Sequence, residues 1–197
     1  MMHRLSLCAL IAAALLGAPS ARAEDGAAIK AKLEPCFACH GENGISALDG
    51  VPSIAAEPEI FLEWQLVFFR TGRVKSEIME PVAAGLSDDD IRAIGAYLAA
   101  LPPIETPPPP DDAPAMTEAG ARLAALRHCG NCHGEGFHGQ QGAARIAGQR
   151  EEVILKALQD YKAGVRFGTG IAAMPEVALA LSDEQMQALA HYLARQR

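Results

Sequence analysis

Two short motifs hold four of the chain's five cysteines, and their residue types suit one kind of chemistry. In CFACH (residues 36–40) and CGNCH (residues 129–133), two thiols lie three positions apart and a histidine follows directly. On a helix such thiols share a face and can reach the two vinyl groups along one edge of a haem, each forming a thioether. The histidine then lies beneath the ring, where its imidazole can bind the iron. The motifs therefore predict two covalent haem c groups, attached through Cys36, Cys39, Cys129 and Cys132, with His40 and His133 as iron ligands.

Other uses of a Cys-x-x-Cys pair fit this chain less well. A four-cysteine zinc ribbon separates its pairs by about 15–20 residues, whereas these motifs are 93 positions apart. A thioredoxin-like redox pair needs a βαβ context, and no stretch of the sequence alternates as a strand. Two structural disulfides remain an alternative, but they would leave the histidine after each pair unexplained.

Two methionines are candidates for the remaining axial position of each iron. Met79 lies eight residues before Ser87, and Met174 lies eight residues before Ser182. Both stand close to a proline, in what we predict to be loops ahead of the last helix of each repeat. Methionine often fills gaps in a core, an explanation that suits Met186 on an apolar helix face better. A methionine opposite the histidine gives a closed haem suited to electron transfer and raises its potential.

The elements that must position these residues belong to an internal repeat. The tripeptide LSD at 86–88 recurs at 181–183, and YLA at 97–99 recurs at 192–194, each displaced by 95 positions. Because the motifs match in order and nearly in spacing, the sequence predicts two homologous modules.

A proline-rich segment separates the modules. Proline fixes φ and removes a backbone donor, so the segment should run as a semi-rigid, polyproline-like spacer. The predicted boundaries are therefore a first module over 24–101, a linker over 102–114 and a second module over 115–197.

Each module is predicted to be all-α, with helices over 25–33, 61–70, 117–127 and 151–162. Pro35 is expected to end the first of these. The last helix of each module is expected to begin at a capping box, Ser87 with Asp90 and Ser182 with Gln185, and His191 is expected on its surface. Apolar residues then fall on one face, namely Ile91, Ile94 and Leu98 in one module and Met186, Leu189 and Leu193 in the other. Modules of about 80 residues bury only a small hydrophobic core and usually need a metal or a disulfide for stability. A haem would fill that role.

The N-terminus and the composition bear on location and partners. His3 and Arg4 precede an apolar stretch over 5–18, and Ala21-Arg22-Ala23 is a cleavage site of the A-x-A type, so residues 1–23 are predicted to be a signal peptide. The mature protein is then periplasmic. It has no transmembrane segment, because the apolar stretch is too short for a retained anchor, although peripheral association with a membrane remains compatible. The formal net charge of -7 argues against nucleic acid and suits basic partners.

Taken together, the paired haem motifs, the methionine segment before LSD and the terminal YLA resemble the dihaem cytochrome c4 family over essentially the whole mature chain. The resemblance implies two tandem class I cytochrome c domains whose haem propionates lie near a shared interface. It also implies a backbone carbonyl that orients each histidine, from Pro52 in the first module and Ala144 in the second, and cationic segments near the propionates at 70–73 and 162–166. The long proline-rich linker departs from the family and leaves the domain packing open.

The function implied is that of a one-electron carrier between redox partners such as a terminal oxidase or a quinol-oxidising complex. An alternative is the electron-accepting dihaem subunit of a larger oxidoreductase, as in flavocytochrome c sulfide dehydrogenases. We do not predict enzymatic activity. Thiosulfate dehydrogenases of similar architecture use a cysteine as an axial ligand, and the mature chain has no cysteine outside its two motifs. Dihaem peroxidases are longer and need one iron with an open or displaceable ligand.

Overall fold

The computed structural model describes residues 21–104, 107–167 and 173–197, so most of the predicted signal peptide lies outside the described residues. Within these ranges the chain is helical and has no strand, as predicted, apart from one isolated bridge between Gln140 and Ala143. None of the described helices is long and apolar enough to cross a bilayer. The elements are α1 (Ala21–His40), α2 (Glu59–Arg70), α3 (Met79–Ala84), α4 (Asp88–Ala99), α5 (Pro114–Leu126), α6 (Cys129–His133), the 3-10 helix η1 (Glu135–Phe137), α7 (Glu151–Lys162), α8 (Ala173–Leu179) and α9 (Asp183–Ala194).

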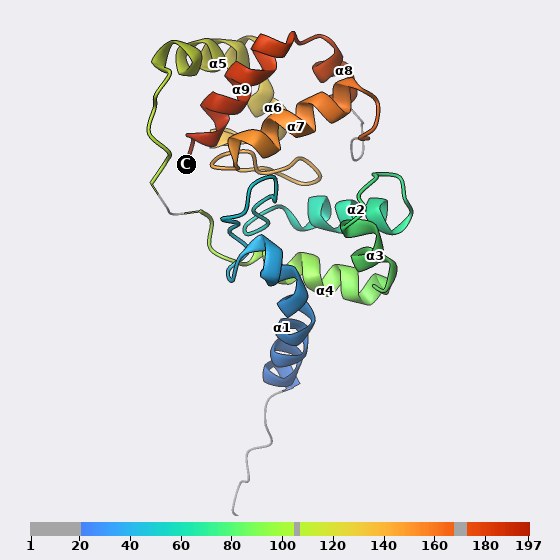
Figure 1. The fold of residues 1–197 in the computed structure, drawn as a ribbon. Coiled ribbons are helices and arrows are strands. Elements are labelled where there is room, and N and C mark those ends of the chain that lie inside the picture. Colours follow the sequence, from blue (N-terminus) through green and yellow to red (C-terminus); the bar gives the residue numbers. More distant parts are fainter. Residues whose placement is uncertain (1–20, 105–106, 168–172) are drawn as a thin grey trace, which may run out of the picture.

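The helices gather in two groups that correspond to the two repeats. Figure 1 shows α1 to α4 in one group and α5 to α9 in the other, with the loops after α1 and α6 lying between them. Each group has its own apolar core, centred on Leu33, Leu62, Ile94 and Leu98 in the first and on Leu158, Met186, Leu189 and Leu193, among others, in the second. These cores lie on the apolar helix faces that the periodicity predicts.

α1 is the helix whose extent differs most from the prediction, because it continues through Pro35 to His40. Proline removes one backbone donor and favours a kink, but packing on both sides of it keeps the chain helical: Leu33 is fully buried, and Phe37 packs against the same core. In the second module the break occurs without a proline. There, His128 takes a left-handed conformation (φ 54°, ψ 37°) between α5 and α6.

Both predicted capping boxes are present. The Ser87 hydroxyl accepts a hydrogen bond from the Asp90 amide at 3.1 Å, and the Ser87 amide donates to the Asp90 carboxylate at 3.1 Å. Ser182 and Gln185 repeat the arrangement at 3.2 and 3.0 Å. These caps satisfy backbone donors that the first turn of α4 and α9 would otherwise leave without partners.

α5 and α9 cross closely because α5 carries a glycine at the crossing point. A Cβ atom on Gly120 would lie 2.1 Å from the Ala188 carbonyl oxygen and 2.5 Å from Tyr192 Cβ. The two backbones can therefore approach only with glycine at this position.

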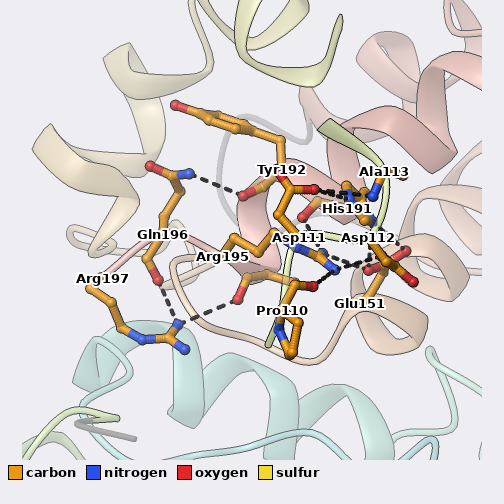
Figure 2. Close-up of polar contacts among 11 residues, drawn as sticks. Pro110, Asp111, Asp112, Ala113, Glu151, His191, Tyr192, Arg195, Gln196 and Arg197 are labelled. Carbon is orange, nitrogen blue, oxygen red and sulfur yellow. Dashed lines mark hydrogen bonds and ion pairs between the residues drawn. The ribbon is translucent and has the colours of Figure 1, made fainter. Parts of the chain in front are cut away.

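The C-terminal end of the linker is fastened to the second module, as Figure 2 shows. Arg195 donates to the Pro110 carbonyl at 2.9 Å, and His191 Nε2 lies 3.2 Å from Asp111 Oδ1. The other ring nitrogen of His191 lies 3.1 Å from Glu151 Oε2 on α7. We call these five residues the linker clasp. His191 was predicted on the helix surface, and that prediction is wrong: it is 3% exposed, because the linker and α7 cover it.

Candidate functional site

The two Cys-x-x-Cys-His motifs lie on helices, as their chemistry requires. The first forms the last turns of α1 and the second forms α6. All four cysteines are free, so the disulfide alternative is not realised. In each motif the first cysteine is partly buried and the second is exposed, and burial raises the pKa of the Cys36 and Cys129 thiols. Two unpaired thiols three positions apart on a helix are available for attachment to one ring edge.

Each motif histidine is held by a backbone carbonyl from the loop that follows it. His40 Nδ1 lies 2.8 Å from the Pro52 oxygen, and His133 Nδ1 lies 2.8 Å from the Ala144 oxygen. Both predicted hydrogen bonds are therefore present, and the identity of the residue does not matter because the bond uses only the main chain. A carbonyl can only accept, so Nδ1 carries the proton and Nε2 keeps its lone pair.

Burial keeps both histidines in this neutral form. Desolvation lowers the pKa of His40 and of His133, while the hydrogen bond to Pro52 or to Ala144 offsets part of that shift. A neutral imidazole of fixed tautomer and orientation is what an iron ligand requires. The neutral state of these two side chains in the structure suits the iron-ligand role that the sequence predicts for them.

Met79 and Met174 lie on short helices and not in loops, which corrects the prediction. Met79 is the first residue of α3, and Met174 is the second residue of α8. The first of these helices forms because the Ser76 hydroxyl accepts from the Met79 amide at 3.0 Å, and the Glu80 carboxylate accepts from the Ser76 amide at 2.9 Å. Both methionines are partly buried and precede the capped helix of their module, so the equivalence seen in the repeat persists in the fold.

The predicted cationic segments divide into two kinds. Arg70 donates to the Leu86 carbonyl at 2.9 Å and Lys162 donates to the Leu181 carbonyl at 2.8 Å, so both brace the turn before the last helix of their module. Arg166, in contrast, reaches across to the first module and donates to Gln65 Oε1 at 2.9 Å.

Donors without acceptors gather at the junction of the two modules. Gln65 Nε2, Arg145 Nε and Arg166 Nε are buried and have no hydrogen-bond partner among the residues that the structure describes. Buried donors of this kind are rare in native proteins and point to a missing acceptor. The carboxylates of two haems whose propionates meet at this junction would satisfy them, so the residues present fit the group. Sequence reasoning missed Arg145, because only the packing of the modules brings it here.

Exposed apolar side chains lie on α2, next to Met79 and just before the second motif. Trp64 on α2 is 44% exposed, Ile78 next to Met79 is 70% exposed, and Leu126 just before the second motif is 72% exposed. An open depression of about 430 Å³ lies along α2, lined by Trp64, Val67, Phe68, Thr71 and Arg73. Exposed apolar surface is what an apolar ring bound against it would cover.

Further hydrogen bonds join the modules. Gln149 accepts from the Ser53 amide at 2.9 Å and donates to the Ser53 carbonyl at 2.8 Å. The Arg145 amide donates to Glu57 Oε2 at 2.8 Å. Glu57, Ser53 and Gln149 are all buried. No local pattern signals these contacts, because each joins residues 88 or 96 positions apart.

Comparisons with known proteins agree with this architecture. Residues 117–196 match the family model for cytochrome c, and residues 21–98 match that for subunit III of cbb3-type cytochrome c oxidase. The chain is 32% identical to the thiosulfate dehydrogenase electron acceptor of Thiomonas intermedia, over 99% of this chain and 92% of the relative. It is 28% identical to cytochrome c4 of Pseudomonas aeruginosa, over 98% of each chain.

Two solved structures resemble the fold. Reduced cytochrome c4 from Pseudomonas stutzeri matches with a TM-score of 0.78 at 26% identity, over 87% of this chain and 98% of that one. A thiosulfate dehydrogenase from Marichromatium purpuratum matches with a TM-score of 0.75 at 30% identity, over 88% of this chain and 40% of that one. The chain belongs to the dihaem cytochrome c4 family and is an electron carrier with two covalently bound haem c groups.

Proposed function

We propose that the protein carries single electrons between redox partners in the periplasm, after removal of residues 1–23. The observation that carries this proposal is the pair of matched hydrogen bonds from His40 and His133 to backbone carbonyls. They prepare one neutral imidazole per module as an axial ligand. Cys36 and Cys39 attach the first haem, and Cys129 and Cys132 attach the second.

Met79 in the first module and Met174 in the second would supply the other iron ligand. The iron, when bound, supplies the one-electron change between its ferric and ferrous states. The chain's task is to keep that change structurally small, because reorganisation of ligands slows electron transfer. A histidine whose orientation is fixed by a hydrogen bond to a backbone carbonyl meets this requirement. Arg145 and Arg166 neutralise propionate charge at the junction and hold the two sites together.

The ligand assignment is tested on the purified mature protein. Its mass should equal the chain from near Glu24 plus two haems, and its oxidised spectrum should show the band that reports methionine bound to iron. Met79→Ala and Met174→Ala should each remove about half of this band, and the double variant should remove it all. Met186→Leu is the matched control, because Met186 is buried in the second core. A mass without haem, or a band that survives the double variant, contradicts the proposal.

A dehydrogenase is a second candidate partner, favoured over a respiratory complex by two of the relatives. Proteins named thiosulfate dehydrogenase electron acceptor, from Thiomonas intermedia and Stutzerimonas stutzeri, align over 99% and 92% of this chain at 32% and 33% identity. On this proposal the protein accepts electrons from the dehydrogenase and performs no substrate chemistry itself, since its four mature cysteines are all in the haem motifs.

Rapid mixing distinguishes the candidate donors. The oxidised protein is mixed with a thiosulfate dehydrogenase and thiosulfate, or with a quinol-oxidising complex and quinol, and haem reduction is followed by absorbance. Fast reduction by the first donor alone assigns it as the dehydrogenase acceptor, and fast reduction by the second alone assigns it to respiration. Catalytic oxidation of thiosulfate by this protein without a dehydrogenase contradicts the carrier function.

A further inference from the structure

One peptide group in each module links the motif histidine to a buried side chain of the other module. The Pro52–Ser53 peptide accepts from His40 Nδ1 at 2.8 Å through its carbonyl and donates to Gln149 Oε1 at 2.9 Å through its amide. In the second module, the peptide between Ala144 and Arg145 does the same. Its carbonyl accepts from His133 Nδ1 at 2.8 Å, and its amide donates to Glu57 Oε2 at 2.8 Å.

Glu57 and Gln149 occupy equivalent positions in the repeat. Each lies five residues after the residue whose carbonyl holds the histidine, Pro52 in one module and Ala144 in the other. The arrangement is therefore symmetric in geometry but not in chemistry, because one module supplies an acid where the other supplies an amide.

The side-chain amide of Gln149 shows which hydrogen bonds a residue at this position can make. Gln149 accepts from the Ser53 amide and also donates from Nε2 to the Ser53 carbonyl at 2.8 Å. An ionised carboxylate can only accept, so Glu57 can reproduce this two-way pairing with Arg145 only when its second oxygen carries a proton. Symmetry thus favours a neutral carboxylic acid at Glu57.

The surroundings of Glu57 favour the same state. The side chain is 5% exposed, and desolvation raises its pKa to about 8, against the lowering effects of the Arg145 amide and the Arg145 and Arg166 guanidinium groups. Within the described part of the chain, these two arginines are the charged groups that act on the carboxyl, and both belong to the second module. Glu57 therefore exchanges its proton near neutral pH, unlike an exposed glutamate.

We propose that Glu57 is a proton-binding positioning residue for the haem of the second module, acting on His133 through the Ala144–Arg145 peptide. An ionised Glu57 polarises this peptide, strengthens its carbonyl as an acceptor for His133, and so favours the oxidised state. A protonated Glu57 favours the reduced state. On reduction, one electron comes from the redox partner and converts ferric to ferrous iron, and one proton from water converts the carboxylate of Glu57 to its acid. Oxidation reverses both transfers.

The first module lacks this response, because Gln149 has no proton to exchange. We therefore expect the potential of the second module's haem to depend on pH through Glu57. The potential of the first module's haem should not depend on pH through Gln149. A tenfold difference in the proton affinity of Glu57 between the two redox states corresponds to a shift of 59 mV for a one-electron couple.

The test is a spectroelectrochemical titration of the intact dihaem protein from about pH 6 to about pH 9. One potential should fall as pH rises, by at least the equivalent of a tenfold change in affinity, and the other should stay flat. In Glu57→Gln, the potential that depends on pH in the wild type should become constant at its low-pH value. In Gln149→Glu, the potential that is constant in the wild type should fall as pH rises. Glu59→Gln, which removes an exposed acid two residues away, should change neither.

Infrared difference spectra give a second measurement that does not depend on variants that fold. Reduction of the wild-type protein at about pH 8, where the Glu57 carboxyl is partly ionised, should by itself produce the C=O stretch of a protonated carboxyl, and Glu57→Gln, where it folds, should lack this band. Two flat potentials in the wild type, or a full pH dependence that survives in Glu57→Gln, overturn the inference. The inference rests on the proposed ligation by His133. Failure of that ligation would appear as loss of the low-spin spectrum, whereas failure of the inference alone leaves the spectrum intact.

Discussion

Replacement of Glu57 by glutamine should stabilise the protein increasingly as pH rises. The pKa of Glu57 is about 8 in the folded chain, against an ordinary value of 4.5. Between these two values the folded state binds a proton that the unfolded state does not, so the free energy of unfolding falls as pH rises. The slope is about 1.4 kcal/mol per pH unit for one proton. The raised pKa of Glu57 therefore lowers the free energy of unfolding of the wild type by about 3 kcal/mol at pH 7, and this loss levels off above about pH 8.

Guanidinium unfolding of the holoprotein, followed by far-ultraviolet circular dichroism, measures this cost. Glu57→Gln and the wild type should differ little near pH 4.5, and the variant should be more stable by about 3 kcal/mol at pH 7. Glu59→Gln is the control for loss of one negative charge and should follow the wild type within about 0.5 kcal/mol. Stability curves of Glu57→Gln and wild type that stay parallel from acid to neutral pH would refute the reasoning, as would a variant less stable at pH 7.

Three further predictions concern the second module. His191→Ala should destabilise it by about 1–3 kcal/mol, because the contacts of the two ring nitrogens with Glu151 and Asp111 are lost. Limited proteolysis should then cut the linker faster, while the exposed His138→Ala should have no such effect. Gly120→Ala should lower the free energy of unfolding by about 1–3 kcal/mol or more, since its Cβ would lie 2.1 Å from a carbonyl oxygen. Gly85→Ala is the control, because a Cβ there would have no atom within 4 Å. Equal losses in the two variants would contradict the packing argument. Ser182→Ala should lower the melting temperature by removing a cap worth about 1 kcal/mol, and an unchanged melting temperature would show that the cap contributes nothing.

Local signals in the sequence were sufficient for much of the fold. The capping residues Ser87 and Ser182 act within one turn of a helix, so their pattern could be recognised without knowledge of packing. The hydrogen bonds from the motif histidines to Pro52 and Ala144 follow from the family resemblance, and they tolerate a change of residue because they use only a main-chain oxygen, 12 positions after the histidine in one module and 11 in the other. The ligand roles of Met79 and Met174 remain predictions.

Features set by packing could not be read in advance. Pro35 usually ends a helix, but tertiary contacts of its neighbours carry α1 through it. His191 lies at a position that looks exposed from its repeat partner, and only the course of the linker buries it. Arg145 and Glu57 meet because two separate modules dock, and no local pattern encodes which loop of one module faces which loop of the other.

The linker clasp has a consequence for how firmly the modules stay associated. Because Pro110 and Asp111 are fastened to α9, only the chain between the end of α4 and Pro110 separates two docked bodies. A short tether raises the effective concentration of one partner around the other, into the millimolar range for flexible tethers. A handful of individually weak hydrogen bonds between the modules then suffices to keep them joined, and any module that separates will rebind before it diffuses away. Lengthening the tether between the end of α4 and Pro110 would dilute the modules within a single molecule, without touching a residue at their interface.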